Sequence, residues 1–241
     1  MNALEDSEFS RAWAAVARSI PKPRAVICIS AHWETAGTKV TAMEQPRTIH
    51  DFYGFPAALS DMQYPAPGSP ELAVATQTAL KRTQVELDHA WGLDHGAWAV
   101  LCRMFPKADV PVIQLSLDRR QGPAFHYDLG CELGELRRKG VLILGSGNVV
   151  HNLRHIAWED KAFDWALEFD AHVRDSIVAH DHNALIHYSK LGNCAQLSVP
   201  TPEHYLPLLY VLGAQTGTDN ATFFANRVTL GSMSMRSVRI G

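Results

Sequence analysis

Residues 25–29 read Ala25-Val26-Ile27-Cys28-Ile29 and follow the proline-rich segment Pro21-Lys22-Pro23. A short, continuous apolar run of this kind is typical of a strand that other elements cover on both faces. Residues 110–117 and 141–145 have the same character. These runs predict the buried strands of a central sheet.

Helical patterns lie between the apolar runs. Ser69 has the character of an N-cap with Pro70 at the first helical position, which predicts a helix to about Leu80. Further helices are expected at about residues 95–104, 125–138, 162–179 and 204–212. Alternating strands and helices predict one α/β domain over residues 1–241, with a mainly parallel central sheet flanked by helices.

Two other stretches carry weaker signals. Residues 35–68 contain many glycine, proline and aromatic residues, and a loop of that length in a compact domain is usually functional or contains short elements. Near the end, residues 221–225 are apolar, and residues 232–238 alternate as a half-exposed edge strand or a final hairpin would.

The composition excludes several classes of protein. A hydrophobic fraction of 46% and a charged fraction of 20% fit an ordinary globular protein, and the formal charge of −3 gives no basic surface for nucleic acid. No apolar run approaches the ~20 residues that span a bilayer, and the first residues do not resemble a secretory signal. The 4 cysteines have no Cys-x-x-Cys spacing. We therefore expect a cytoplasmic location and no membrane partner.

Three histidines lie at predicted element boundaries within compact local motifs. His32 ends the first apolar strand, His151 follows Gly145-Ser146-Gly147-Asn148, and His204 stands after Pro202 at a predicted helix start. Neutral imidazole is a common metal ligand, and ligands in open α/β sheets bind beyond the carboxyl ends of the strands. A single histidine of this kind is more often a capping or surface residue. Together, the three predict one metal site assembled by folding.

Two more histidines are candidates for a role in catalysis or binding. His95, in Asp94-His95-Gly96, begins a predicted helix, whose N-terminal dipole favours a neutral imidazole that acts as a base or donor. A helix-capping role for His95 is an equal alternative. His50 lies in the long loop and is a candidate for substrate binding, with a hydrogen bond to Asp51 as the ordinary alternative.

At these residues the chain resembles the extradiol ring-cleaving dioxygenases of the protocatechuate 4,5-dioxygenase superfamily, and especially the 4,5-DOPA extradiol dioxygenases. The matching motifs follow the family's order along nearly the whole chain. They are Ser30-Ala31-His32-Trp33, Ile49-His50-Asp51-Phe52-Tyr53-Gly54-Phe55-Pro56, Tyr64-Pro65-Ala66-Pro67-Gly68, Leu93-Asp94-His95-Gly96, Ser146-Gly147-Asn148-Val149-Val150-His151-Asn152-Leu153 and Pro200-Thr201-Pro202-Glu203-His204-Tyr205-Leu206-Pro207.

The resemblance implies a single α/β domain with one mononuclear divalent metal, Zn²⁺ or Fe²⁺, held by histidines. It implies that His32 and His204 bind the metal, and that His151 is either another ligand or the acid/base residue. His95 corresponds to a histidine that contacts the substrate. The substrates are then a catechol-type, DOPA-like aromatic and O₂, and a homo-oligomer is possible.

One family feature is missing from this chain. A Gly-His-Gly-Ser-Pro segment, whose histidine is a metal ligand, normally precedes the stretch that corresponds here to Met1-Asn2-Ala3-Leu4-Glu5-Asp6. Because the downstream motifs are intact, we expect that the natural start lies upstream and that the N-terminal strand is absent from the 241 residues.

The chemistry of the site leaves alternatives. Extradiol cleavage needs a catechol and O₂ on one metal, with a nearby base for which His95 and His151 are the candidates. Fe(II) suits this reaction, whereas an all-histidine set also suits Zn²⁺, which does not exchange electrons with O₂. Glu203 is expected to project from another side of a helix than His204. The alternative function is therefore a zinc-binding relative that acts as a hydrolase or a non-catalytic metal protein, and a scaffold without a site is less favoured.

Overall fold

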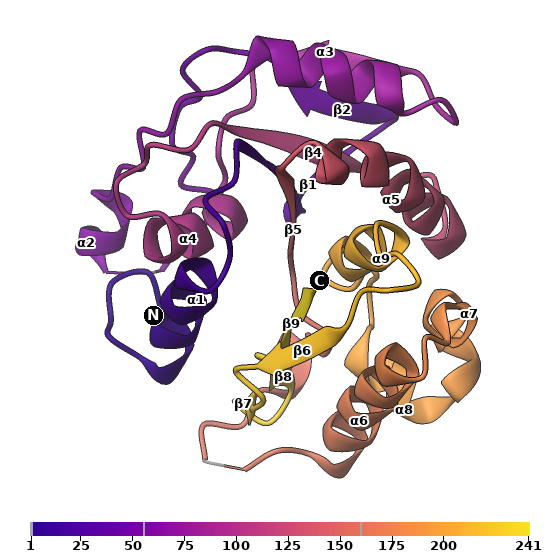
Figure 1. Cartoon of the computed structure of the whole chain (residues 1–241). Helices are drawn as coiled ribbons and strands as arrows, with labels where there is room; N and C mark the ends of the chain where they lie inside the picture. Colours follow the sequence, from indigo (N-terminus) through magenta and orange to yellow (C-terminus); the bar gives the residue numbers. More distant parts are fainter. Residues whose placement is uncertain (1, 55, 160) are drawn as a thin grey trace.

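The computed structural model describes residues 2–54, 56–159 and 161–241, and in these residues a five-stranded sheet has the order β3-β2-β4-β1-β5 (Figure 1). Met1 and Phe55, which fall in motifs quoted above, lie outside the described residues. β1 runs parallel to β4 and β5, β2 runs parallel to β3, and β2 and β4 are antiparallel. The predicted mainly parallel sheet is therefore confirmed. The strands are β1 Ala25–Thr35, β2 Thr38–Thr41, β3 Val85–Asp88, β4 Val112–Asp118 and β5 Val141–Ser146.

Helices cover both faces of this sheet. In Figure 1, α1 and α4 lie on one side of β1, and α5 and α9 lie on the other. No helix in the described ranges is both long and apolar enough to cross a membrane. The helices are α1 Glu8–Arg18, α2 Ala57–Ser60, α3 Pro70–Ala79, α4 His95–Met104, α5 Pro123–Arg138, α6 Asp164–Val178, α7 His182–Ile186, α8 Asn193–Ser198 and α9 Leu206–Gly213, with short 3₁₀ turns at Leu153–His155 and Tyr188–Leu191.

β1 explains why its sequence is apolar without interruption. Successive side chains of a strand point to opposite faces, so Val26 and Cys28 pack in the layer with α1 and α4, whereas Ile27 and Ile29 pack with α5 and α9. The strand also continues to Thr35, with an irregularity in its pairing to β4 after Ile29. His32 therefore lies within a bulged strand, and the expectation that it ends the strand is wrong.

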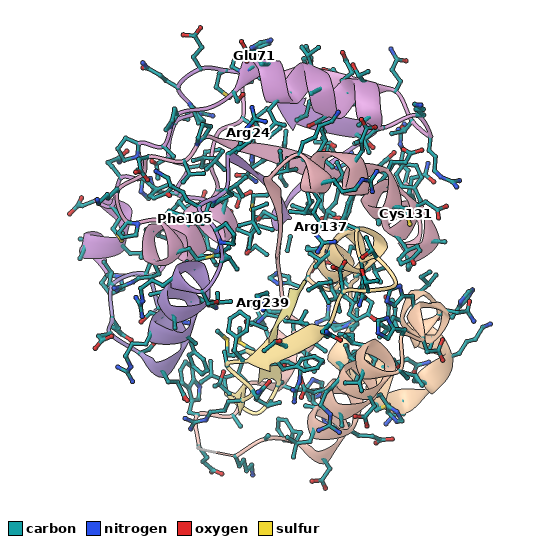
Figure 2. All side chains as sticks on the ribbon, viewed as in Figure 1. Arg24, Glu71, Phe105, Cys131, Arg137 and Arg239 are labelled. Atoms are coloured by element: carbon teal, nitrogen blue, oxygen red, sulfur yellow. The ribbon has the colours of Figure 1, made fainter. Side chains whose placement is uncertain are left out.

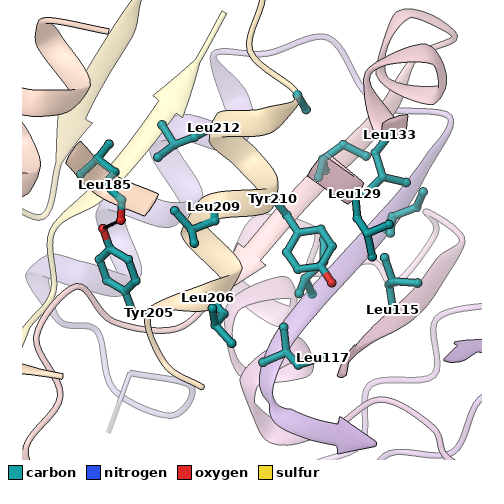
Figure 3. Packing of buried hydrophobic residues seen from close by; sticks show 14 of the residues in the cluster. Leu115, Leu117, Leu129, Leu133, Leu185, Tyr205, Leu206, Leu209, Tyr210 and Leu212 are labelled. Carbon is teal, nitrogen blue, oxygen red and sulfur yellow. Dashed lines mark hydrogen bonds between the residues drawn. The ribbon is translucent and has the colours of Figure 1, made fainter. Parts of the chain in front are cut away.

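The larger of the two core clusters includes the face of the sheet that α5 and α9 cover. Figure 3 shows Tyr210 of α9 beside Leu129 of α5 and Leu115 of β4, with Leu209 on the opposite side of α9, and these four side chains are fully buried. Burying each side chain of this size contributes about 1.5–3 kcal/mol. This packing fixes the position of α9 and hence of His204, which lies in the turn just before it.

The C-terminal residues form two small two-stranded sheets. Their strands are β6 Ala221–Phe224, β7 Val228–Thr229, β8 Met233–Ser234 and β9 Ser237–Ile240. β6 pairs with β9 and β7 pairs with β8, so the single strand considered for residues 232–238 is wrong. An isolated bridge joins Met233 to His151, which ties this segment to the predicted site.

A buried ion pair holds β8 in place and leads to a stability prediction. Asp170 of α6 accepts hydrogen bonds from Ser234 Oγ at 2.6 Å and from Arg236 Nη2 at 2.6 Å, and the side chains of Asp170 and Arg236 are only 7% and 11% exposed. Asp170→Ala leaves the guanidinium buried without its partner, so we expect a loss of about 3–5 kcal/mol in the free energy of unfolding. Urea denaturation measures it. The exposed Asp175→Ala is the control, and an equal loss in both variants contradicts the prediction.

β5 forms one edge of the sheet as far as the described residues show, because it pairs with β1 on one side and with no strand on the other. Beside this edge is a cavity of ≈ 450 Å³ that extends as far as His204. Arg137 and Arg239, both labelled in Figure 2, belong to its lining. Most of the lining is apolar, and it includes Trp13 and Val16 of α1, Val100 and Met104 of α4, Leu142 and Leu144 of β5, and Leu208 and Val211 of α9.

Candidate metal and catalytic site

His32 is positioned by a buried polar network behind β1. Its backbone N–H lies 3.2 Å from Ser30 Oγ, and Ser30 Oγ donates in turn to Asp94 Oδ1 at 2.7 Å. Asp94 is itself held by Gln114, which accepts from the Asp94 N–H and donates to Asp94 Oδ2, each at 2.8 Å. Ser30, Asp94 and Gln114 are fully buried. Because every one of these polar groups is paired, the bulge that carries His32 is well defined.

His95 is the first residue of α4, as predicted, and Asp94 is its N-cap. The rings of His95 and His32 lie 3.9 Å apart between centroids. A Cβ at Gly96 would collide with Ser30 Oγ and with the ring of His32. The Asp-His-Gly sequence therefore allows the helix to begin directly against His32.

His204 and His151 come together at the other side of the site. Their rings stack, with centroids 3.5 Å apart and an interplanar angle of 10°. The Asn148 N–H donates to the His204 carbonyl at 2.8 Å, and a Cβ at Gly147 would collide with that carbonyl. The His151 N–H donates to the Ser198 carbonyl at 2.9 Å. The Gly-Ser-Gly-Asn loop thus holds the two histidines together.

The two pairs of histidines form one cluster, because the rings of His32 and His204 are 5.2 Å apart and meet edge to face. His204 Nδ1 is buried and has no hydrogen-bond partner among the described residues. A buried nitrogen without a partner is costly unless a ligand satisfies it. The donor set of imidazole nitrogens and this orphaned atom fit a divalent metal ion such as Zn²⁺ or Fe²⁺.

Burial also favours the protonation state that binds metal. It lowers the pKa of His204 to about 2, with the neighbouring histidines adding to the effect, and it lowers the pKa of His151. Burial and the neighbouring His95 lower the pKa of His32. The three imidazoles are therefore neutral at physiological pH, which leaves a lone pair available on each.

Two carboxylates, those of Asp51 and Glu203, lie in the cluster, and neither was predicted to be part of the metal site. Ligand atoms of His32, Asp51 and His95 lie within 4.8 Å of one another, and so do those of His151, Glu203 and His204. The expectation that Glu203 points away from His204 is wrong, because the two residues lie in a turn before α9 and not in the helix. The sequence does show Glu203 beside His204 and Asp51 beside His50, but adjacency in sequence does not reveal where a side chain points.

His50 lies beside the cluster and not within it. Its ring is 5.7 Å from that of Trp98 and 5.9 Å from that of Phe52, and Phe52 is 5.4 Å from His95. His50 Nε2 is hydrogen-bonded to the Met62 carbonyl at 2.8 Å, and this is the hydrogen bond seen for its side chain within the described residues. The ordinary alternative, a bond to Asp51, is therefore not observed.

The chain is similar to ring-opening dioxygenases along almost its whole length. Residues 4–236 match the family described as the catalytic LigB subunit of aromatic ring-opening dioxygenase. A protein of Escherichia coli (strain K12), 4,5-DOPA dioxygenase extradiol, is 47% identical over 247 residues, which cover 100% of this chain and 91% of that protein. The protein of the same name from Beta vulgaris is 37% identical over 247 residues, covering 99% of this chain and 92% of its own.

A solved structure shares the fold. The crystal structure of an uncharacterized protein from Escherichia coli K12 matches with a TM-score of 0.87 and 42% sequence identity. The match covers 99% of this chain and 94% of that one.

Proposed function

The chain belongs to the family of catalytic LigB subunits of aromatic ring-opening dioxygenases, and we propose that it opens the ring of a DOPA-like catechol with O₂. In extradiol cleavage the ring opens between one hydroxyl-bearing carbon and the neighbouring carbon outside the diol. Both oxygen atoms of O₂ enter the product. The observation that carries the proposal is the cluster of His32, His95, His151 and His204. Family membership does not favour the alternative of a zinc-dependent hydrolase.

We propose that His32 and His204 hold one mononuclear metal, and that His151 either completes the set or acts as the acid/base residue. The support is the 5.2 Å separation of the His32 and His204 rings and the orphaned His204 Nδ1. When bound, the metal favours the deprotonated catechol and, if it is Fe(II), exchanges electrons with O₂, which Zn²⁺ does not do. We propose Fe(II) for the reaction.

The remaining roles follow from what lies next to the ligands. His95 accepts the proton of the second catechol hydroxyl and later returns it, since it is close to His32 without being needed as a ligand. His50 contacts the substrate, because its ring lies beside Phe52, which in turn flanks His95. The buried core around Trp98 excludes water from this side.

The proposed function is tested by loading the protein with Fe(II) under anaerobic conditions and then adding O₂ and a catechol. We expect O₂ consumption equal to the amount of ring-opened product, which absorbs visible light. The Zn²⁺-loaded protein is the control and should consume no O₂. Metal binding without O₂ uptake for any catechol would instead support the zinc-binding alternative.

His95→Gln should separate catalysis from metal binding. We expect the metal content to stay nearly unchanged and the catechol turnover to fall by roughly 10²–10⁴, the range for loss of an acid/base group. Metal analysis of the purified variant and steady-state kinetics measure the two effects. If the variant loses its metal, His95 is a ligand and the assigned role is wrong.

We also propose that a further strand completes the site along the free edge of β5. The support is the ≈ 450 Å³ apolar cavity between α1, α4 and α9. Leu142 and Leu144 are only half-buried there, whereas every residue of the central strand β4 is buried. An extended segment in this cavity would pair with the open edge of β5 and cover these leucines. Because the cavity reaches His204, one end of that strand would lie at the metal site.

A further inference from the structure

The carboxylate of Asp51 lies between two histidines of the site. Its Oδ2 atom is 3.0 Å from His95 Nδ1 and 3.6 Å from His32 Nδ1. The Asp51 side chain is 19% exposed, so solvent screens these contacts only in part. A carboxylate this close to two imidazoles determines which of their nitrogens carries a proton.

Asp51 holds His95 at two points. Its Oδ1 atom accepts the backbone N–H of His95 at 2.9 Å, while Oδ2 faces the ring nitrogen. The contact to the ring has the length of a hydrogen bond but not its ideal direction, as is common before substrate binds.

The geometry points to Asp51 as a positioning residue that keeps the proton of His95 on Nδ1 and leaves Nε2 as the nitrogen that accepts the catechol proton. This inference rests on the proposed ring-opening reaction. A neutral imidazole has one donor and one acceptor nitrogen, and a carboxylate can only accept. Facing Asp51, Nδ1 must therefore be the donor. The backbone contact holds the start of α4, and with it the backbone of His95, against the same carboxylate.

The competing role for Asp51 is that of a metal ligand, since it shares the 4.8 Å grouping with His32 and His95. The Asp51 carboxylate already accepts from the His95 backbone with Oδ1 and faces the His95 ring with Oδ2, so a metal bound to it would compete with both contacts. The two roles differ in what is lost when the charge is removed. A ligand takes the metal with it, whereas a positioning residue changes only the state of His95.

The test compares Asp51→Asn with wild type, with Asp61→Asn, an exposed carboxylate near the same loop, as the matched control. The tautomer of His95 is measured by ¹⁵N NMR of the imidazoles, with the His95→Gln spectrum assigning the signal. This measurement needs neither substrate nor turnover. We expect a shift of the His95 signal toward the Nε2–H form in Asp51→Asn, unchanged metal content, and no change in Asp61→Asn.

Kinetics then follow the consequence for the reaction. We expect kcat of Asp51→Asn to fall by roughly 10–100-fold with little change in KM, as for other groups that orient a reacting side chain. Asp51→Glu, which keeps the carboxylate, should retain a higher kcat than Asp51→Asn. Adding Asp51→Asn to His95→Gln should lower kcat no further than His95→Gln alone, because Asp51 acts through His95.

Three results overturn the inference: loss of metal in Asp51→Asn, an unchanged His95 tautomer, or additive effects in the double variant. If wild type opens no catechol ring while the tautomer still shifts, the proposed function fails and the positioning role stands.

Discussion

Replacing His204 with Ala is expected to remove the metal and abolish ring opening. His204 stacks on His151 and meets the ring of His32 edge to face, so its imidazole joins the two pairs of histidines. Its buried Nδ1 has no partner among the described residues, and the metal is the partner we propose for it. Groups that merely support a ligand are worth 10–100-fold in metal affinity, so losing the ligand itself should cost more than about 100-fold.

The measurement is a titration of Fe(II) or Zn²⁺ into metal-free protein, followed by the O₂ assay. His89→Ala is a matched control, because His89 is exposed and lies outside the cluster. Urea denaturation of metal-free His204→Ala checks that the fold survives. A His204→Ala protein that is folded and keeps the wild-type metal affinity would remove His204 from the proposed ligand set.

Adding a Gly-His-Gly-Ser-Pro segment and a strand before Met1 tests the strand proposed for the edge of β5, and we expect the extended protein to bind metal more tightly and unfold at a higher temperature. The added histidine would supply one more ligand near His204, and the added strand would fill the cavity beside β5. Each large apolar side chain buried there contributes about 1.5–3 kcal/mol. For a chain of this size, 1 kcal/mol raises Tm by roughly 2–4 °C.

The experiment compares the 241-residue chain with the extended form, both expressed and purified in the same way. Metal titration and thermal unfolding are measured for each form, and for the long form with its added histidine changed to Ala. Measured without metal, this third protein should have the same raised Tm as the long form. Its metal affinity should be no higher than that of the short form. Equal metal affinities in the short and long forms would contradict the prediction.

The sequence predicted those parts of the fold whose signal is local. β1 begins with a short apolar run and β5 contains another, and α4 begins at the predicted residue because Asp94 is a strong N-cap. β2 and β3 were missed, since each has only four residues and neither is a continuous apolar run. α1 was also missed, although its Ser7 forms a capping box with Ser10.

In the site, the histidines were predictable and the acidic groups were not. His32, His151 and His204 stand in distinctive motifs, and the structure brings them together, while their roles as ligands stay a prediction. Asp51 was considered only as a partner of its neighbour His50. Its actual partner, the backbone of His95, is 44 residues away in the chain, and no local pattern indicates such a contact.

The division of the site between two distant parts of the chain has a consequence for folding. His32 and His95 come from the first half, whereas His151 and His204 come from the second, and the two pairs touch only in the finished tertiary structure. Contacts between residues so far apart in sequence form late and slowly, because a long loop must close first. During refolding from urea, helical circular dichroism should therefore recover well before ring-opening activity does. The recovery of activity then reports when the two halves of the site come together. Because the site forms late, metal added before refolding should slow unfolding more than it speeds folding.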